Sequence, residues 1–133
     1  MEFSELCKLA FSVVKPRRLS EYAEAGGVGA ALETDSGKVY LGVCIDVACS
    51  TGFCAEHAAA AAMVTAGESQ VVKMVAVDWE GRPMPPCGRC RETITSLHPE
   101  NYKALVMVNA DTVLTLEELL PFDWKRREET AGE

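Results

Sequence analysis

The chain contains 133 residues, and 48% of them are hydrophobic, as in a soluble globular protein of one domain with its own core. Its net charge is -7, from 13 basic and 20 acidic residues, which argues against a nucleic-acid partner, because affinity for nucleic acid comes mainly from neutralising phosphates. The sequence has no apolar run long enough to cross a membrane, and its first residues lack the basic start of a secretion signal, so we expect a cytoplasmic protein.

Apolar periodicity predicts alternating helices and strands along most of the chain. In chain order these are a helix over 3–14, strands over 28–32 and 39–47, and a helix over 54–66. A strand over 71–77, a helix over 88–97 and a strand over 104–108 follow. A short strand near Thr112 and a helix over 115–120 come last. Pro16 and Gly67 end the first two helices. Turn residues Asp35-Ser36-Gly37 join the first two strands into a hairpin.

The order of these elements predicts an α/β fold. Helices between strands indicate right-handed crossovers, and therefore a mainly parallel sheet with helices packed on both faces. Residues 1–124 are expected to form a single domain, and residues 125–133 a polar C-terminal tail.

Three of the six cysteines have the spacing of a metal site. Cys54 opens one predicted helix, and Cys87 and Cys90 open another. A helix N-terminus favours the thiolate, which is the form that binds zinc, and the i, i+3 spacing brings two sulfurs to one side of the first turn. Three protein ligands leave one position of a tetrahedral zinc ion open for water, as in catalytic sites.

Glu56 follows Cys54 by two residues and is the candidate for the base that takes a proton from a zinc-activated water. The alternative is a closed structural site in which Cys44 or Cys49 is a fourth ligand. Cys7 is interpreted as a small buried hydrophobic residue.

A zinc ion with three thiolates carries a formal charge of -1, so groups that draw charge from the sulfurs are expected nearby. Arg91 lies four residues after Cys87, and His57 lies three residues after Cys54. Either side chain could donate a hydrogen bond to the neighbouring sulfur. The alternatives are an exposed helix cation for Arg91 and a packing role for His57, and Arg89 is expected to face solvent.

These residues resemble the zinc-dependent cytidine deaminase superfamily, whose signature is a His or Cys followed by x-Glu and, later, Pro-Cys-x-x-Cys. The matching segments are Cys54-Ala55-Glu56 and Pro86-Cys87-Gly88-Arg89-Cys90. Similarity extends over residues 28–122. The three-cysteine site is similar to the small free-nucleoside deaminases and to the blasticidin S deaminases.

The resemblance implies a three-layer α/β/α sandwich around a mixed sheet of five strands, with Zn2+ as cofactor. It also implies hydrolytic deamination of a cytidine-like aminopyrimidine nucleoside, in which Glu56 passes protons to the ring and to the departing ammonia. Cys44, Asp46 and Ala55 are the implied substrate contacts. A homotetramer is implied as well, in which Phe122 and Trp124 are candidates to complete a neighbour's pocket.

The chain departs from the family pattern at several positions. Gly26 stands where an aromatic residue is typical, two residues before the Val-Gly-Ala-Ala strand. Cys44-Ile45-Asp46 replaces the Asn-x-Glu that holds the ribose hydroxyls, and His57 replaces an arginine. Arg82 could contact an anionic group of a larger substrate, although a surface role explains it more simply.

Three alternatives to a nucleoside deaminase follow from these departures. The first is a deaminase of blasticidin S or of another modified cytosine, which Gly26 and the Cys44-Ile45-Asp46 segment favour. The second is a non-catalytic scaffold of the same fold, stabilised by zinc, and the retained Glu56 argues against it. Deamination of a nucleic acid is disfavoured by the net charge and by cysteine as the first ligand.

Overall fold

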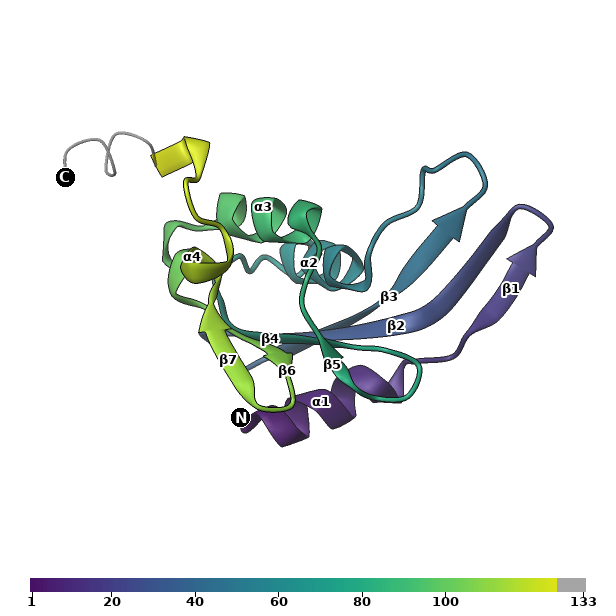
Figure 1. Ribbon diagram of the computed structural model, residues 1–133, viewed down its shortest axis with the longest axis horizontal. Helices are drawn as coiled ribbons and strands as arrows, with labels where there is room; N and C mark the ends of the chain where they lie inside the picture. The colour runs from purple at the N-terminus through teal and green to yellow at the C-terminus, as the bar shows by residue number, and fades with distance from the viewer. Residues whose placement is uncertain (127–133) are drawn as a thin grey trace.

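The computed structural model describes residues 1–126, which form helices around a seven-stranded sheet (Figure 1). Its strands are β1 (Arg17–Ser20), β2 (Ala23–Thr34), β3 (Val39–Val47), β4 (Val71–Val77), β5 (Pro83–Met84), β6 (Leu105–Asn109) and β7 (Thr112–Thr115). Its helices are α1 (Phe3–Ser12), α2 (Ala55–Thr65), α3 (Gly88–Leu97) and α4 (Leu116–Leu119), with 3-10 helices η1 (Pro99–Lys103) and η2 (Trp124–Arg126). The strand order is β1-β2-β4-β6-β7, with β3 paired to β2 and β5 paired to β4.

Helices cover both faces of this sheet. Leu6 and Ala10 of α1 pack with Ala31 of β2 and with Val75 and Val77 of β4, which forms a small core on one face. On the other face, a larger core joins the sheet to α2, α3 and α4. Figure 1 shows α1 on one side of the strands and α2 and α3 on the opposite side. The predicted three-layer α/β class is therefore confirmed.

The orientation of the strands differs from the prediction of a mainly parallel sheet. Among the described residues, β4 and β6 form a parallel pair, and the other pairings are antiparallel. The α2 crossover does connect two parallel strands, because β3 and β4 are each antiparallel to β2. However, β2 lies between them, and the spacing of apolar residues carries no information about such an insertion.

Most predicted elements are present with bounds within a few residues. The exceptions are β1 and β5, which the sequence analysis missed, and β2, which begins at Ala23 instead of Val28. Lys125 and Arg126 of the predicted tail belong to η2, where Lys125 Nζ lies 2.8 Å from a Glu92 carboxylate oxygen. The remainder of that tail, residues 127–133, lies outside the described residues. None of the described helices combines the length and apolarity needed to span a bilayer.

Helix α2 packs closely against the sheet at Gly42 of β3. A Cβ atom at this position would lie 2.4 Å from the backbone nitrogen of Ala59 and 2.6 Å from the carbonyl oxygen of Ala55. The part of α2 that faces Gly42 carries alanines, of which Ala55 and Ala59 are fully buried. Glycine on the strand and alanines on the helix therefore set the height of α2 above the sheet, and with it the position of the residues at its N-terminus.

Replacement of Gly42 with Ala should destabilise the protein by about 1–3 kcal/mol, because the added methyl group overpacks this contact. Denaturant unfolding followed by circular dichroism measures the change. Gly27→Ala is the matched control, because a Cβ there meets no atom within 4 Å, and its effect should stay within about 0.5 kcal/mol. Equal losses of stability in the two variants would contradict the packing argument.

Candidate active site

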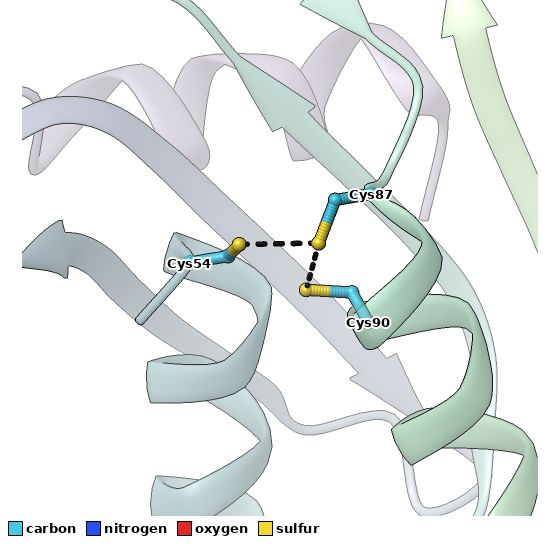
Figure 2. A group of neighbouring side chains, drawn as sticks. All are labelled: Cys54, Cys87 and Cys90. Atoms are coloured by element: carbon cyan, nitrogen blue, oxygen red, sulfur yellow. Dashed lines mark hydrogen bonds between the residues drawn. The ribbon is translucent and has the colours of Figure 1, made fainter. Parts of the chain in front are cut away.

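Cys54, Cys87 and Cys90 come together at the N-termini of two neighbouring helices (Figure 2). Cys54 is the N-cap residue of α2, Cys87 is the N-cap residue of α3, and Cys90 lies in the first turn of α3. The Sγ atoms of Cys54 and Cys87 are 3.2 Å apart, and those of Cys87 and Cys90 are 3.4 Å apart. All three sulfurs lie within 4.8 Å of one another.

This cluster has the dimensions and the chemistry of a zinc site. Sulfurs bound to one tetrahedral zinc ion at about 2.3 Å lie about 3.8 Å from each other, within a small side-chain rotation of the arrangement seen here. Burial is the main reason why the pKa values of two of the thiols are raised, that of Cys54 to about 11 and that of Cys90 further. Burial also acts to raise the pKa of Cys87, but hydrogen bonds with Cys54 and Cys90 outweigh it and lower the value. Three thiols this close cannot all ionise without a cation, and a divalent ion would supply one.

Glu56 lies in the first turn of α2, two residues after Cys54, and is buried, with 4% of its surface exposed. Burial raises the pKa of its carboxyl group, which therefore holds a proton more readily than an exposed glutamate. Glu56 lines the same cavity as Cys54 and Cys87. The site thus pairs a metal-binding cluster with a group able to accept and return a proton.

A cavity of about 690 Å³ opens onto these groups, which is within the usual range for small-molecule sites. It is lined from β2 and β3, the loop before α2, the start of α2, and the β4–β5 and β5–α3 loops. The lining residues are Gly27, Val28, Cys44, Ile45, Asp46, Val47, Ser50, Gly52, Phe53, Cys54, Ala55, Glu56, Trp79, Met84, Pro85, Cys87 and Arg89.

The three residues predicted to contact a substrate all line this cavity. Asp46 is exposed near the end of β3, and Ala55 is fully buried between Cys54 and Glu56. Cys44 also has a local role, because its sulfur accepts a hydrogen bond from the backbone N–H of Val28 at 3.3 Å. That N–H lies in the irregular part of β2 between Ala25 and Gly29, where the register with β3 shifts.

The expected hydrogen bonds from His57 and Arg91 to sulfur are not what the structure shows. The Arg91 side chain donates to the carbonyl oxygens of Pro86, at 2.8 Å, and Leu119, at 3.0 Å. It therefore ties the segment before Cys87 to the end of α4. The His57 ring lies 5.8 Å from the ring of Phe53, and its buried Nδ1 has no hydrogen-bond partner among the described residues.

The alternative of a closed four-cysteine site is not supported in the described part of the chain. The group there that could hold a metal ion consists of three cysteines. Cys49 is exposed, and its Sγ atom lies 3.3 Å from the Thr51 hydroxyl oxygen. The Cys44 sulfur accepts a hydrogen bond from the Val28 backbone N–H. Cys7 is half-buried against Met107, in line with a packing role.

Two arginines lie near the site or its neighbouring loop. Arg82, interpreted as a surface residue more than as a contact for an anionic group, is exposed and paired with Asp78 and Glu80. Arg89, expected to face solvent, is exposed but also lines the cavity. Trp79 lines it as well and was not singled out from the sequence, because an aromatic residue in a loop has no distinctive spacing.

Comparison with known proteins places the chain in a family. It is 39% identical over 98 residues to a cytidine deaminase from Halalkalibacterium halodurans, covering 71% of this chain and 74% of that protein. The chain belongs to the cytidine deaminase superfamily. It is also 32% identical over 108 residues to a blasticidin-S deaminase from Bacillus cereus, covering 74% and 77% of the two chains.

The fold comparison agrees with this assignment. The crystal structure of cytidine deaminase from Mycobacterium tuberculosis matches with a TM-score of 0.77 and 26% identity, over 93% of this chain and 98% of that chain. No protein-family profile matches the sequence.

The cluster makes a direct prediction about metal content. The purified protein should hold about one zinc ion per chain, and alanine in place of Cys54, Cys87 or Cys90 should remove most of it, because two thiolates bind zinc far less tightly than three. Elemental analysis after gel filtration measures the ratio. Cys49→Ala, which removes an exposed thiol outside the cluster, should keep the full content. Loss of zinc in this control, or retention in the three ligand variants, would contradict the assignment.

Proposed function

We propose that the protein is a zinc-dependent hydrolytic deaminase of a cytidine-like aminopyrimidine nucleoside and releases ammonia. The observation that carries this proposal is the buried Glu56 carboxyl group, which lines the same cavity as Cys54 and Cys87, two of the three clustered thiols. Family membership adds support, because the similar proteins named above are cytidine and blasticidin-S deaminases. A non-catalytic scaffold would have no need of a buried carboxyl group in an open cavity.

In this proposal Cys54, Cys87 and Cys90 hold the zinc ion. When bound, zinc would make a water molecule acidic enough to serve as the nucleophile near neutral pH. Glu56 accepts the two protons of the attacking water in turn and delivers one to the ring nitrogen and one to the leaving amine. The carbon–nitrogen bond to that amine breaks, a carbonyl group takes its place, and ammonia leaves. Arg91 acts indirectly, since it fixes the loop that carries Cys87.

Burial gives Glu56 the properties that this role needs. Its pKa is raised above that of an exposed glutamate, so the energy of its protonated form lies closer to that of its ionised form at neutral pH. The fully buried Ala55 fixes the backbone between the metal ligand and the proton carrier. Zinc ligand and proton carrier therefore keep a constant separation on one rigid helix.

Replacement of Glu56 with Gln should leave zinc bound and lower turnover at least a hundredfold, because the amide cannot accept the water proton and general acid–base catalysis contributes about 10²–10⁴-fold. Ammonia release and loss of ultraviolet absorbance measure turnover, and elemental analysis measures zinc. Turnover near the wild-type rate in a zinc-loaded Glu56→Gln protein would sink the mechanism.

The same assay decides between two substrate classes when it is run on cytosine, cytidine, deoxycytidine, blasticidin S and guanine. Cytidine and deoxycytidine are the expected substrates. Deamination of blasticidin S or another modified cytosine is the second candidate. The observation in its favour is that the Cys44 sulfur already takes part in a hydrogen bond within the protein. The donor is the Val28 N–H, so Asp46 is left as the acidic group for a ribose hydroxyl on this strand. Selective turnover of blasticidin S would favour the second candidate.

A homotetramer in the cytoplasm is proposed as the working form, with a small nucleoside-like molecule as its ligand and no nucleic acid. Two aromatic residues near the C-terminus support association. Phe122 is 97% exposed and has a positive φ of 57°, and Trp124 is 71% exposed. Burial of such side chains by a neighbouring chain stabilises an assembly.

Light scattering of the purified protein should give the mass of four chains, and Phe122→Ala should shift the distribution toward smaller species. A fully active monomer would contradict a pocket shared between subunits. Tyr22→Ala, which changes another exposed aromatic residue, is the matched control.

A further inference from the structure

Position 26 cannot carry the aromatic side chain that the family resemblance places there. Gly26 has a φ of 85°, and a Cβ atom on it would lie 2.1 Å from the carbonyl oxygen of Lys15. The backbone N–H of Lys15 donates to the Gly26 carbonyl oxygen at 2.9 Å, which holds the two segments together. Any side chain at this position would therefore force two backbone segments apart.

Trp79 supplies an aromatic side chain to the same cavity from a different element. It lies on the loop between β4 and β5, lines the cavity and is 61% exposed. Phe53 is the other aromatic residue in the lining, but it is partly buried and its ring packs near His57. Trp79 is thus the aromatic residue with the larger free surface for a ligand.

Trp79 and a glycine of β2 line the same cavity. Val77 of β4 pairs with Gly29 of β2, and the two strands are antiparallel. Beyond this pair, Trp79 lies in the loop after β4 and Gly27 lies in β2, and both residues line the cavity. A Cβ atom on Gly27 would meet nothing within 4 Å. The β2 side of the cavity is therefore not filled by a side chain at this position.

The loop that carries Trp79 is held in a fixed shape by Asp78. One carboxylate oxygen of Asp78 accepts the backbone N–H groups of Glu80, at 2.9 Å, and Arg82, at 3.0 Å, and the other accepts the Arg82 guanidinium at 3.0 Å. The Asp78 backbone N–H also donates to the Arg82 carbonyl oxygen at 3.0 Å. A rigid loop presents its side chain to a ligand at little cost in conformational entropy.

We propose that Trp79 is a specificity-determining residue, whose indole packs against the sugar or sugar-like ring of the substrate and replaces the aromatic contact that Gly26 cannot make. This inference rests on the proposed function for the orientation of the substrate, whose amine-bearing ring must lie at the thiol cluster. The remainder of the nucleoside then extends along the cavity toward its exposed lining, where Trp79 lies. Apolar packing of this kind has little directional preference.

The inference names the substrate class more closely. The Cys44 sulfur already accepts a hydrogen bond from the Val28 backbone N–H. Affinity for the sugar therefore depends on contact with Trp79 more than on recognition of the sugar hydroxyl groups. The substrate should therefore be an aminopyrimidine joined to a ring, with ribose and deoxyribose treated similarly. A free base, which lacks the second ring, should gain nothing from Trp79.

Ligand binding tests the inference without any turnover. Calorimetry on the zinc-loaded protein compares uridine with uracil, which are the nucleoside and the free base that deamination would produce. Trp79→Ala should weaken uridine binding by about tenfold, as expected for loss of an aromatic contact, and leave uracil binding unchanged. Trp79→Phe should restore most of the uridine affinity. Tyr22→Ala, at an exposed aromatic residue outside the cavity lining, should change neither.

Fluorescence gives a second readout, because the chain has two tryptophans. In a Trp124→Phe variant, emission from Trp79 should change saturably on addition of uridine, with a dissociation constant equal to the one that calorimetry gives for the same variant. Circular dichroism and zinc content report whether each variant is folded.

The outcomes separate this inference from the proposed function. Equal losses of uridine and uracil affinity in Trp79→Ala, no loss of either, or no uridine binding by the wild type would overturn the role of Trp79. A wild-type protein that binds uridine through Trp79 but deaminates no compound would overturn the function and support the role. Normal deamination of cytidine by Trp79→Ala with an unchanged KM would support the function and overturn the role of Trp79.

Discussion

The structure depends on the confinement of three thiols where two helices begin. Cys54 belongs to the start of α2, and Cys87 and Cys90 belong to the start of α3, yet all three sulfurs lie within 4.8 Å of one another. Two of these thiols hold their protons tightly because they are buried. Such a group gains stability from a divalent cation that replaces the protons, and the helix N-termini favour the resulting negative charge. The cavity and the buried carboxyl group of Glu56 lie beside this cluster.

The fold positions the centre through contacts that lie outside it. Gly42 lets α2 approach β3 closely enough to fix the height of Cys54 and Glu56. On the other side, the Arg91 guanidinium joins the segment before Cys87 to the end of α4. Gly42 has no side chain, and the Arg91 side chain donates to backbone carbonyl oxygens instead of to a cysteine sulfur. The geometry of the site is therefore a consequence of helix–sheet packing and of one arginine bound to backbone carbonyl groups.

Local information sufficed for the elements and for the candidate metal ligands. The spacing of apolar residues, together with helix-ending proline and glycine residues, located α1, α2, β4 and α3 closely. The spacing of the thiols located the cluster. Each of these signals lies within a short stretch of sequence. Information on long-range contacts was absent. The insertion of β2 between β3 and β4, the partners of Arg91 and the approach of Trp79 to the cavity depend on segments far apart in the sequence. The short strands β1 and β5 were missed because pairing with a longer neighbour, more than their composition, makes them strands.

X-ray absorption spectroscopy of the purified protein at the zinc edge tests the central claim most directly, because it reads the donor atoms around the metal. The account predicts three sulfur atoms at about 2.3 Å and one oxygen or nitrogen atom at about 2.0 Å. A shell of four sulfurs, or a protein that binds no zinc at all, would contradict it.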